Sequence, residues 1–309
     1  DILAQHIRGL NRELAGFVDT HALANAKDHP WHLVINGDMF DFVAIPLVRE
    51  EDEHALSELD SDPVCPTEVE TVVWKLGRIL EVHRPLFKSL SRFVLAGHRV
   101  TMVEGNHDAQ FYFPEVRQAL SEFMLDEARK LQRQDKVELD EALFRQNVQY
   151  RPWFQAKAGL YHIEHGHQYD AYCSFEYNLA PFERGETKSI ATPMTHRLLP
   201  YFSKLIGQFS THDVDKWGMF DWVSFGLKLG PKIAGGLVKA YLTAMVELLG
   251  QSGESRRAEL RHSAKLQEER LKMLAEDSDY EWATLKTLEA LRATPAEFSF
   301  LTMLNIFLR

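Results

Sequence analysis

Three short apolar segments of the sequence each lead directly into a loop that combines glycine with carboxylate, amide or imidazole side chains. The segments span residues 31–36, 99–104 and 160–164, and the loops after them read Gly-Asp-Met-Phe-Asp, Gly-Asn-His-Asp and His-Gly-His. Short apolar runs that end in such loops predict buried strands. Because α/β proteins place chemistry at strand ends, we expect an α/β fold in which the three loops meet at one edge of a sheet.

Helical patterns separate these strands and dominate the second half of the chain. Apolar residues recur at three- and four-residue spacing over residues 2–18 and predict a helix with one inner face. Further helices are predicted over residues 69–80, 114–124 and 254–276. The acidic, proline-containing segment 49–70 is predicted to be an exposed loop.

Charge and cysteine content narrow the classes of function. The chain has 35 lysines and arginines against 45 acidic residues, a net charge of −10, and no basic block. This argues against a nucleic-acid partner. The only two cysteines, Cys65 and Cys173, are too few for a disulfide framework and favour a reducing, cytoplasmic location. The sequence contains no uncharged apolar run of about 18 residues, so it predicts no transmembrane helix.

The donor atoms in the three loops indicate a metal site. Asp38 and Asn106 offer oxygen atoms and His165 a ring nitrogen, a mixture that suits Mn, Fe, Zn or Co. We expect two divalent ions about 3.5 to 4 Å apart, with Asp38 between them and a bridging hydroxide that attacks phosphorus. His107 would stay unligated beside the phosphate and donate a proton to the leaving oxygen.

The same loops resemble the calcineurin-like metallophosphoesterase superfamily, whose signature includes GDxxD, GNHD or GNHE, and a histidine before glycine. The resemblance extends from Asn36 to about residue 170. It implies a β-sandwich of two mixed sheets flanked by helices. It also implies that Asp38 bridges the two ions, that Asn106 and His165 bind the second ion, and that His107 and Asp108 form the catalytic pair.

Three further polar residues in or next to these loops are candidates for supporting roles. Asp41 is the trailing acid of its motif and is expected to shape the loop more than to bind metal. His167 and Asp170 are candidates for contact with phosphate or with the metal ligands.

Two motifs of the superfamily are missing from the sequence. No DxH precedes Asp38, and no GHxH follows His167. Either the chain is a piece of a longer protein, with these motifs beyond Asp1 and Arg309, or it is a degenerate domain that serves as a binding scaffold. We favour the first explanation, because both ends of the chain break off inside apparent helical or apolar structure.

We accordingly expect a phosphoesterase core over residues 1–171 that lacks its first strand. Residues 172–309 are expected to form a helical insertion or lid, with the final core segment missing. The position of this insertion is similar to that in the UDP-2,3-diacylglucosamine hydrolase branch, where it covers lipid chains. The Phe, Trp and Leu residues between 194 and 249 would suit a phosphorylated lipid-linked substrate and peripheral membrane contact, or simply form the insertion's own core. A phosphorylated small molecule is the other expected substrate.

Overall fold

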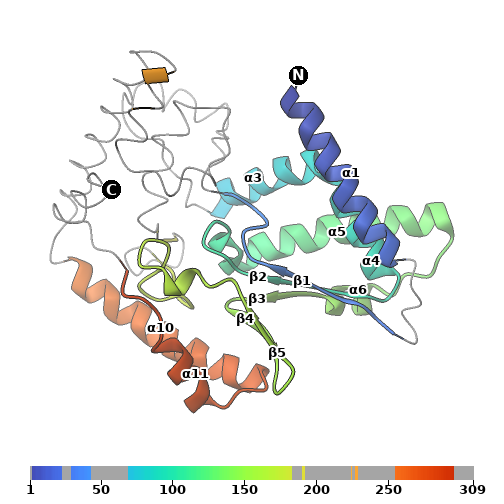
Figure 1. The fold of residues 1–309 in the computed structure, drawn as a ribbon. Helices are drawn as coiled ribbons and strands as arrows, with labels where there is room; N and C mark the ends of the chain where they lie inside the picture. The colour runs from blue at the N-terminus through green and yellow to red at the C-terminus, as the bar shows by residue number, and fades with distance from the viewer. Residues whose placement is uncertain are drawn as a thin grey trace. The chain divides into compact units, whose positions relative to one another are not determined.

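The computed structural model describes residues 2–22, 29–42, 69–182, 190–191, 224, 227–228 and 255–295 (Figure 1). The chain is a mixed α/β protein with a parallel and an antiparallel sheet. It divides into two compact units. Unit 1 comprises residues 1–39 and 68–165, and unit 2 comprises residues 40–67 and 166–309.

The parallel sheet of unit 1 has the strand order β1-β2-β3. Its strands are β1 (His32–Asn36), β2 (Arg99–Val103) and β3 (Val148–Arg151). Asn36 lies beside Val103, and Val103 beside Arg151, so the three carboxyl ends share one edge of the sheet. The predicted strands at 31–36 and 99–104 are confirmed. β3 was not predicted. Its four residues, Val-Gln-Tyr-Arg, are too few for an alternation of apolar and polar side chains to be recognised.

The third predicted strand lies in a different sheet. β5 (Tyr161–Glu164) pairs antiparallel with β4 (Phe154–Lys157). The expectation that all three loops leave one sheet is therefore wrong. The physical reason is the tight turn between the two strands, where Gly159 has a φ of 73° and lets the chain fold back on the segment just before it.

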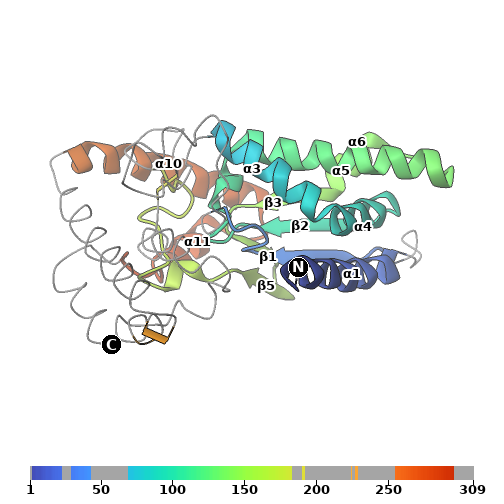
Figure 2. The ribbon, with the colours of Figure 1, turned by 90° about the horizontal axis from the view of Figure 1, so that it is seen from above.

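Helices cover one face of the parallel sheet, as Figures 1 and 2 show. In unit 1 they are α1 (Ile2–Ala22), α3 (Val69–Val82), α4 (Arg84–Leu95), α5 (Pro114–Asp135) and α6 (Glu141–Asn147). α4 and α6 contact β2, and α5 packs on α3 and α4. The helices predicted over 69–80 and 114–124 are confirmed. Proline begins α5, where its missing N–H costs no helical hydrogen bond.

α1 packs with only part of the face that its apolar pattern predicts. Leu10, Leu14 and Phe17 of that face are exposed, whereas Val18 of the same face is buried, together with the polar Asn11. α1 packs against α4, and Asn11 accepts a hydrogen bond from the His83 ring at 2.8 Å. This polar contact turns the Asn11 side of the helix inward.

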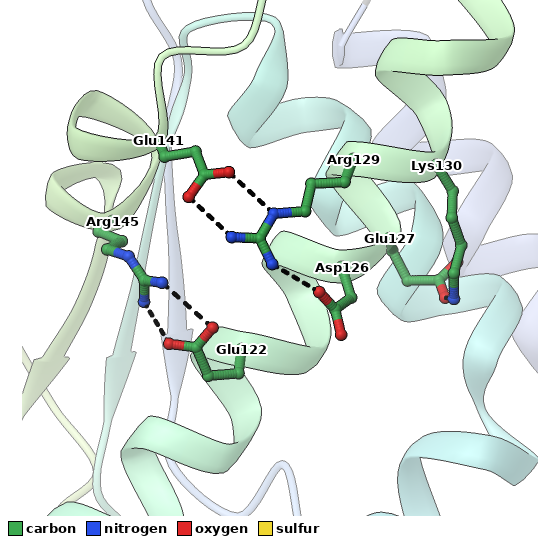
Figure 3. A network of polar contacts seen from close by, with 7 residues as sticks. All are labelled: Glu122, Asp126, Glu127, Arg129, Lys130, Glu141 and Arg145. Carbon is green, nitrogen blue, oxygen red and sulfur yellow. Dashed lines mark hydrogen bonds and ion pairs between the residues drawn. The ribbon is translucent and has the colours of Figure 1, made fainter.

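Paired charges join α5 to α6 (Figure 3). Arg129 forms two hydrogen bonds of 2.8 Å to the Glu141 carboxylate, and it also binds Asp126 at 2.8 Å. Arg145 holds Glu122 in the same two-pronged way, at 2.6 and 3.1 Å. These pairs lie at the surface, so each contributes little to stability on its own.

Glu127 of α5 is the buried member of this charged region. Its side chain is only 4% exposed, and one of its oxygens accepts from both Lys130, at 2.6 Å, and Arg84 of α4. The Glu127 carboxylate therefore ties α5 to α4 at a position that water barely reaches.

The described part of unit 2 is a short segment packed on a pair of helices, α10 (Ser255–Asp277) and α11 (Trp282–Glu289). The Leu179 N–H donates to Gln267 at 2.8 Å, and the Arg270 side chain donates to the Leu179 carbonyl. α10 confirms the helix predicted over 254–276. Of the apolar stretch 194–249 only residues 224, 227 and 228 are described, and the expected loop at 49–70 lies outside the described residues except for its last two. Among the helices that are described, none is long and apolar enough to cross a membrane.

Candidate metal centre

Three of the predicted ligands come together in unit 1. His165 Nε2 lies 3.2 Å from Asp38 Oδ2 and 3.2 Å from Asn106 Oδ1. The other Asp38 oxygen, Oδ1, accepts a hydrogen bond of 3.0 Å from the backbone N–H of His107. The loops after β1, β2 and β5 thus meet through their side chains, as the sequence predicts.

The carboxyl end of β1 fixes the orientation of the His165 ring. His165 Nδ1 donates to the Asn36 carbonyl at 2.9 Å, and the Asn36 side chain donates to the Glu164 carbonyl at 3.0 Å. Because a carbonyl can only accept, Nδ1 carries a proton. Nε2 is therefore the ring nitrogen directed at Asp38 and Asn106.

The charges of Asp38 and His165 stabilise each other. Burial raises the pKa of Asp38, but the hydrogen bonds from His165 and His107 outweigh it and lower that pKa to about 2. Burial lowers the pKa of His165, but the hydrogen bonds to Asp38 and to the Asn36 carbonyl raise it above its ordinary value. In the metal-free protein, His165 therefore offers a proton to the oxygens that would share a metal with it.

Backbone geometry holds Asp38 in an unusual conformation. Asp38 has a φ of 53° and Gly37 a φ of 78°, both in the left-handed region. A non-glycine residue held there costs about 1 to 3 kcal/mol, and such strain collects at functional sites. Two glycines let the loops approach. A Cβ on Gly37 would lie closer than 3.0 Å to the His165 ring, and one on Gly105 closer than 3.0 Å to Asp38.

Asp108 joins the first two loops through its side chain. Oδ1 accepts from the Gly105 N–H at 2.7 Å, and Oδ2 accepts from the Met39 N–H at 2.9 Å. The residue is 2% exposed. Its carboxylate thus binds the backbone of the Asp38 loop as well as that of its own loop.

The three converging side chains fit part of a metal coordination shell. Two ligands that each lie about 2.1 Å from one ion, at an angle between a right angle and the tetrahedral angle, are roughly 3.0 to 3.4 Å apart. The two distances of 3.2 Å fall in this range. Within the described ranges, no three His, Cys, Asp or Glu side chains are grouped to hold an ion. Asp38 and His165 are two residues of this kind, and Asn106 supplies an amide oxygen.

The remaining predicted residues belong to unit 2. Asp41 lies between Phe40 and Phe42, whose buried rings stack 5.7 Å apart. Asp170 accepts from the Tyr172 N–H at 2.8 Å and so caps its own turn. His167 begins a short 3-10 helix, His167–Tyr169. A role for Asp41, His167 or Asp170 in the site stays a prediction.

Sequence reasoning missed the part that Asn36 plays. It orients His165 through its backbone carbonyl and holds β5 through its side-chain amide. The only signal in the sequence is a polar residue that ends an apolar strand just before Gly37-Asp38. A backbone acceptor leaves no mark in residue type, so this role required the structure.

Comparison of the chain with family models, with curated proteins and with solved structures finds no match.

Proposed function

We propose that this protein is a metal-dependent phosphoesterase that hydrolyses a phosphomonoester, phosphodiester or pyrophosphate bond with two divalent ions. The observation that carries the proposal is the meeting of Asp38, Asn106 and His165 at ligand-like distances of 3.2 Å. These residues come from three loops far apart in the sequence, each directly after a strand. A structural turn or helix cap does not require that convergence.

Each residue has a defined task under this proposal. When bound, the two ions would supply Lewis-acid stabilisation and a nucleophile at neutral pH. Asp38 would hold both ions, and Asn106 and His165 would hold one of them through Oδ1 and Nε2. Asn36 keeps the His165 ring turned so that Nε2 faces the site, the outer support that metal-binding histidines commonly have. His107 would donate a proton to the leaving oxygen.

The finer fold and the substrate are part of the same proposal. A parallel sheet with helices on one face and a separate β-hairpin support a core of the β-sandwich kind, with two mixed sheets flanked by helices. Residues 172–309 would form a helical insertion of this core. Their Phe, Trp and Leu content favours a phosphorylated substrate with an apolar part.

Metal binding and hydrolysis by the full-length protein, including any DxH and GHxH motifs beyond Asp1 and Arg309, test this proposal. Mn²⁺ binding is measured by titration calorimetry, and hydrolysis with p-nitrophenyl phosphate and bis(p-nitrophenyl) phosphate. Asp38→Ala and His165→Ala should each lose metal and activity. His107→Ala should keep metal and lower kcat by roughly 10² to 10⁴-fold, the usual contribution of a general acid. His21→Ala, in the last turn of α1 and not in any of the three loops, is the matched control and should change neither property.

Full metal occupancy in both Asp38→Ala and His165→Ala would overturn the ligand assignment. A full-length protein that lacks the DxH and GHxH motifs, and that neither binds Mn²⁺ nor hydrolyses either ester, would support the alternative function, a degenerate phosphoesterase-like domain that acts as a binding scaffold.

A further inference from the structure

Asp108 is almost completely buried and joins two loops that the sequence separates. Its two oxygens accept N–H bonds of 2.7 and 2.9 Å from Gly105 and Met39. Met39 directly follows Asp38, and Gly105 directly precedes Asn106. Each end of the carboxylate therefore holds a backbone amide next to a proposed metal ligand.

We infer that Asp108 is a positioning residue that clamps the Asp38 loop to the Asn106 loop and thereby sets the metal affinity of the site. This inference rests on the proposed function, and it assigns Asp108 a different task from that of a proton partner for His107.

The chemistry of the side chain supports a clamp. A carboxylate presents acceptors on both of its oxygens, which is what two backbone N–H groups from different loops require. Hydrogen bonds between an ionised acceptor and backbone N–H groups are about twice as strong as neutral ones. Asparagine has the same shape, but its NH₂ end would face one of the two N–H donors, and two donors cannot bond. Asp108→Asn should therefore release one loop.

Other contacts across the same two loops make the position of Asp38 depend on the clamp. The His107 N–H donates to Asp38 Oδ1 at 3.0 Å, and Gly105 packs so close to Asp38 that a Cβ would collide with it. If the loops move apart, Asp38 and Asn106 no longer face His165 Nε2 together. The oxygen atoms of the metal site would then be lost as a set, although Asp108 itself binds no metal.

The test compares Asp108→Asn with Asp140→Asn in the full chain. Asp140 is a matched control, because its carboxylate also accepts two backbone N–H bonds, both of 3.0 Å, at the start of α6. Two properties are measured: amide hydrogen exchange at Met39 and Gly105 in metal-free protein, and the affinity for Mn²⁺ by calorimetry. Asp108→Asn should speed exchange at one or both amides. It should also weaken Mn²⁺ binding by about 10 to 100-fold, the usual effect of losing an outer-shell partner. Asp140→Asn should change neither.

Hydrolysis at saturating Mn²⁺ separates the clamp from a proton partner. A clamp acts on metal placement, so Asp108→Asn should recover most of its kcat when Mn²⁺ is raised above its weakened affinity. Unchanged Mn²⁺ affinity with a loss of kcat that metal does not restore would overturn the inference. If Asp108→Asn does not fold, Asp108→Glu, which keeps both acceptors but displaces them by one methylene, is measured in the same way with the same expectations.

The amide measurement keeps this inference separate from the proposed function. A full-length wild-type protein that binds no Mn²⁺ contradicts the phosphoesterase proposal and the effect on metal affinity. Exchange at Met39 and Gly105 still decides whether Asp108 clamps the loops, and unchanged exchange in Asp108→Asn would overturn the clamp.

Discussion

The absence of a side chain at one position is as important to the site as the ligands themselves. Gly105 packs against both the backbone nitrogen and the carboxylate of Asp38. A Cβ at position 105 would lie 2.6 Å from that nitrogen and closer still to the carboxylate oxygen Oδ1, which is too close for either contact. Backbone atoms cannot yield as the end of a flexible side chain can. Only glycine at position 105 therefore leaves room for Asp38 to lie next to the Asn106 loop.

Gly105→Ala should displace Asp38 and disrupt the metal centre. We expect the affinity for Mn²⁺ to fall at least tenfold and the free energy of unfolding to drop by about 1 to 3 kcal/mol, the usual effect of overpacking. Gly77→Ala is the matched control, because Gly77 lies in α3 with nothing near its missing Cβ. That change should stabilise the protein by about 0.5 to 1 kcal/mol through helix propensity. Calorimetry and urea unfolding give both quantities, and equal Mn²⁺ affinities in the two variants would contradict this account.

Among the ion pairs between helices, those with a buried member should contribute more to the stability of the fold than those with both side chains exposed. The Arg145–Glu122 pair between α6 and α5 has both side chains more than 40% exposed. Glu127, in contrast, is 4% exposed and links α5 with α4 through Arg84. Water can replace the partner of Glu122, but it has little access to Glu127.

Glu127→Gln should therefore destabilise the protein more than Glu122→Gln. The buried carboxylate loses charge-assisted bonds to both Arg84 and Lys130, for which we expect a cost of about 1.5 to 3 kcal/mol. Glu122→Gln, the matched surface control, should cost less than about 1 kcal/mol. Thermal unfolding of both variants measures the difference, and a smaller effect at position 127 than at 122 would contradict the assignment.

At the scale of elements, the sequence predicted local structure well and long-range pairing poorly. β1, β2, α3 and α5 follow from apolar periods and from glycine and proline signals that lie within each segment. The sheet to which β5 belongs depends on the competition between β4 and more distant strands, which no local pattern records. The packing face of α1 likewise depends on a partner, His83, about 70 residues away.

The candidate site shows the same division between residue type and backbone. Asp38, Asn106 and His165 could be singled out from the sequence because their side chains are of types that bind metals, and the three meet in the structure. The tasks of Asn36 and Asp108 depend on backbone carbonyl and N–H groups that every residue has. These tasks became visible only in three dimensions.

For the molecule as a whole, two partly buried histidines of unit 1 link stability to pH. His32 contacts Thr101 at 2.7 Å, and burial, together with Arg99 and Arg151, lowers its pKa. Burial also lowers the pKa of His83. The folded state therefore resists protonation that the unfolded chain accepts near pH 6.5.

Stability should fall as the pH drops below about 6.5, because the unfolded chain then takes up protons that His32 and His83 in the folded protein do not. The loss should continue until the pH reaches the lowered pKa values of the folded state. His83→Gln should show a smaller decrease in thermal midpoint between pH 7.5 and pH 5.5 than the wild type. The difference between the two proteins isolates His83 from His165, whose raised pKa acts in the opposite direction. Equal decreases would show that His83 is protonated equally in both states.

The bond from His165 to the Asn36 carbonyl spans 129 residues of chain, and this separation sets an order of events during protein synthesis. At about 5 to 20 residues per second, a ribosome needs roughly 6 to 26 seconds to travel from Asn36 to His165. Over that interval Asp38, joined later by Asn106, lacks the His165 imidazole. Helices can form within microseconds of leaving the ribosome, but the candidate metal centre can assemble only after the last of its three loops has been translated.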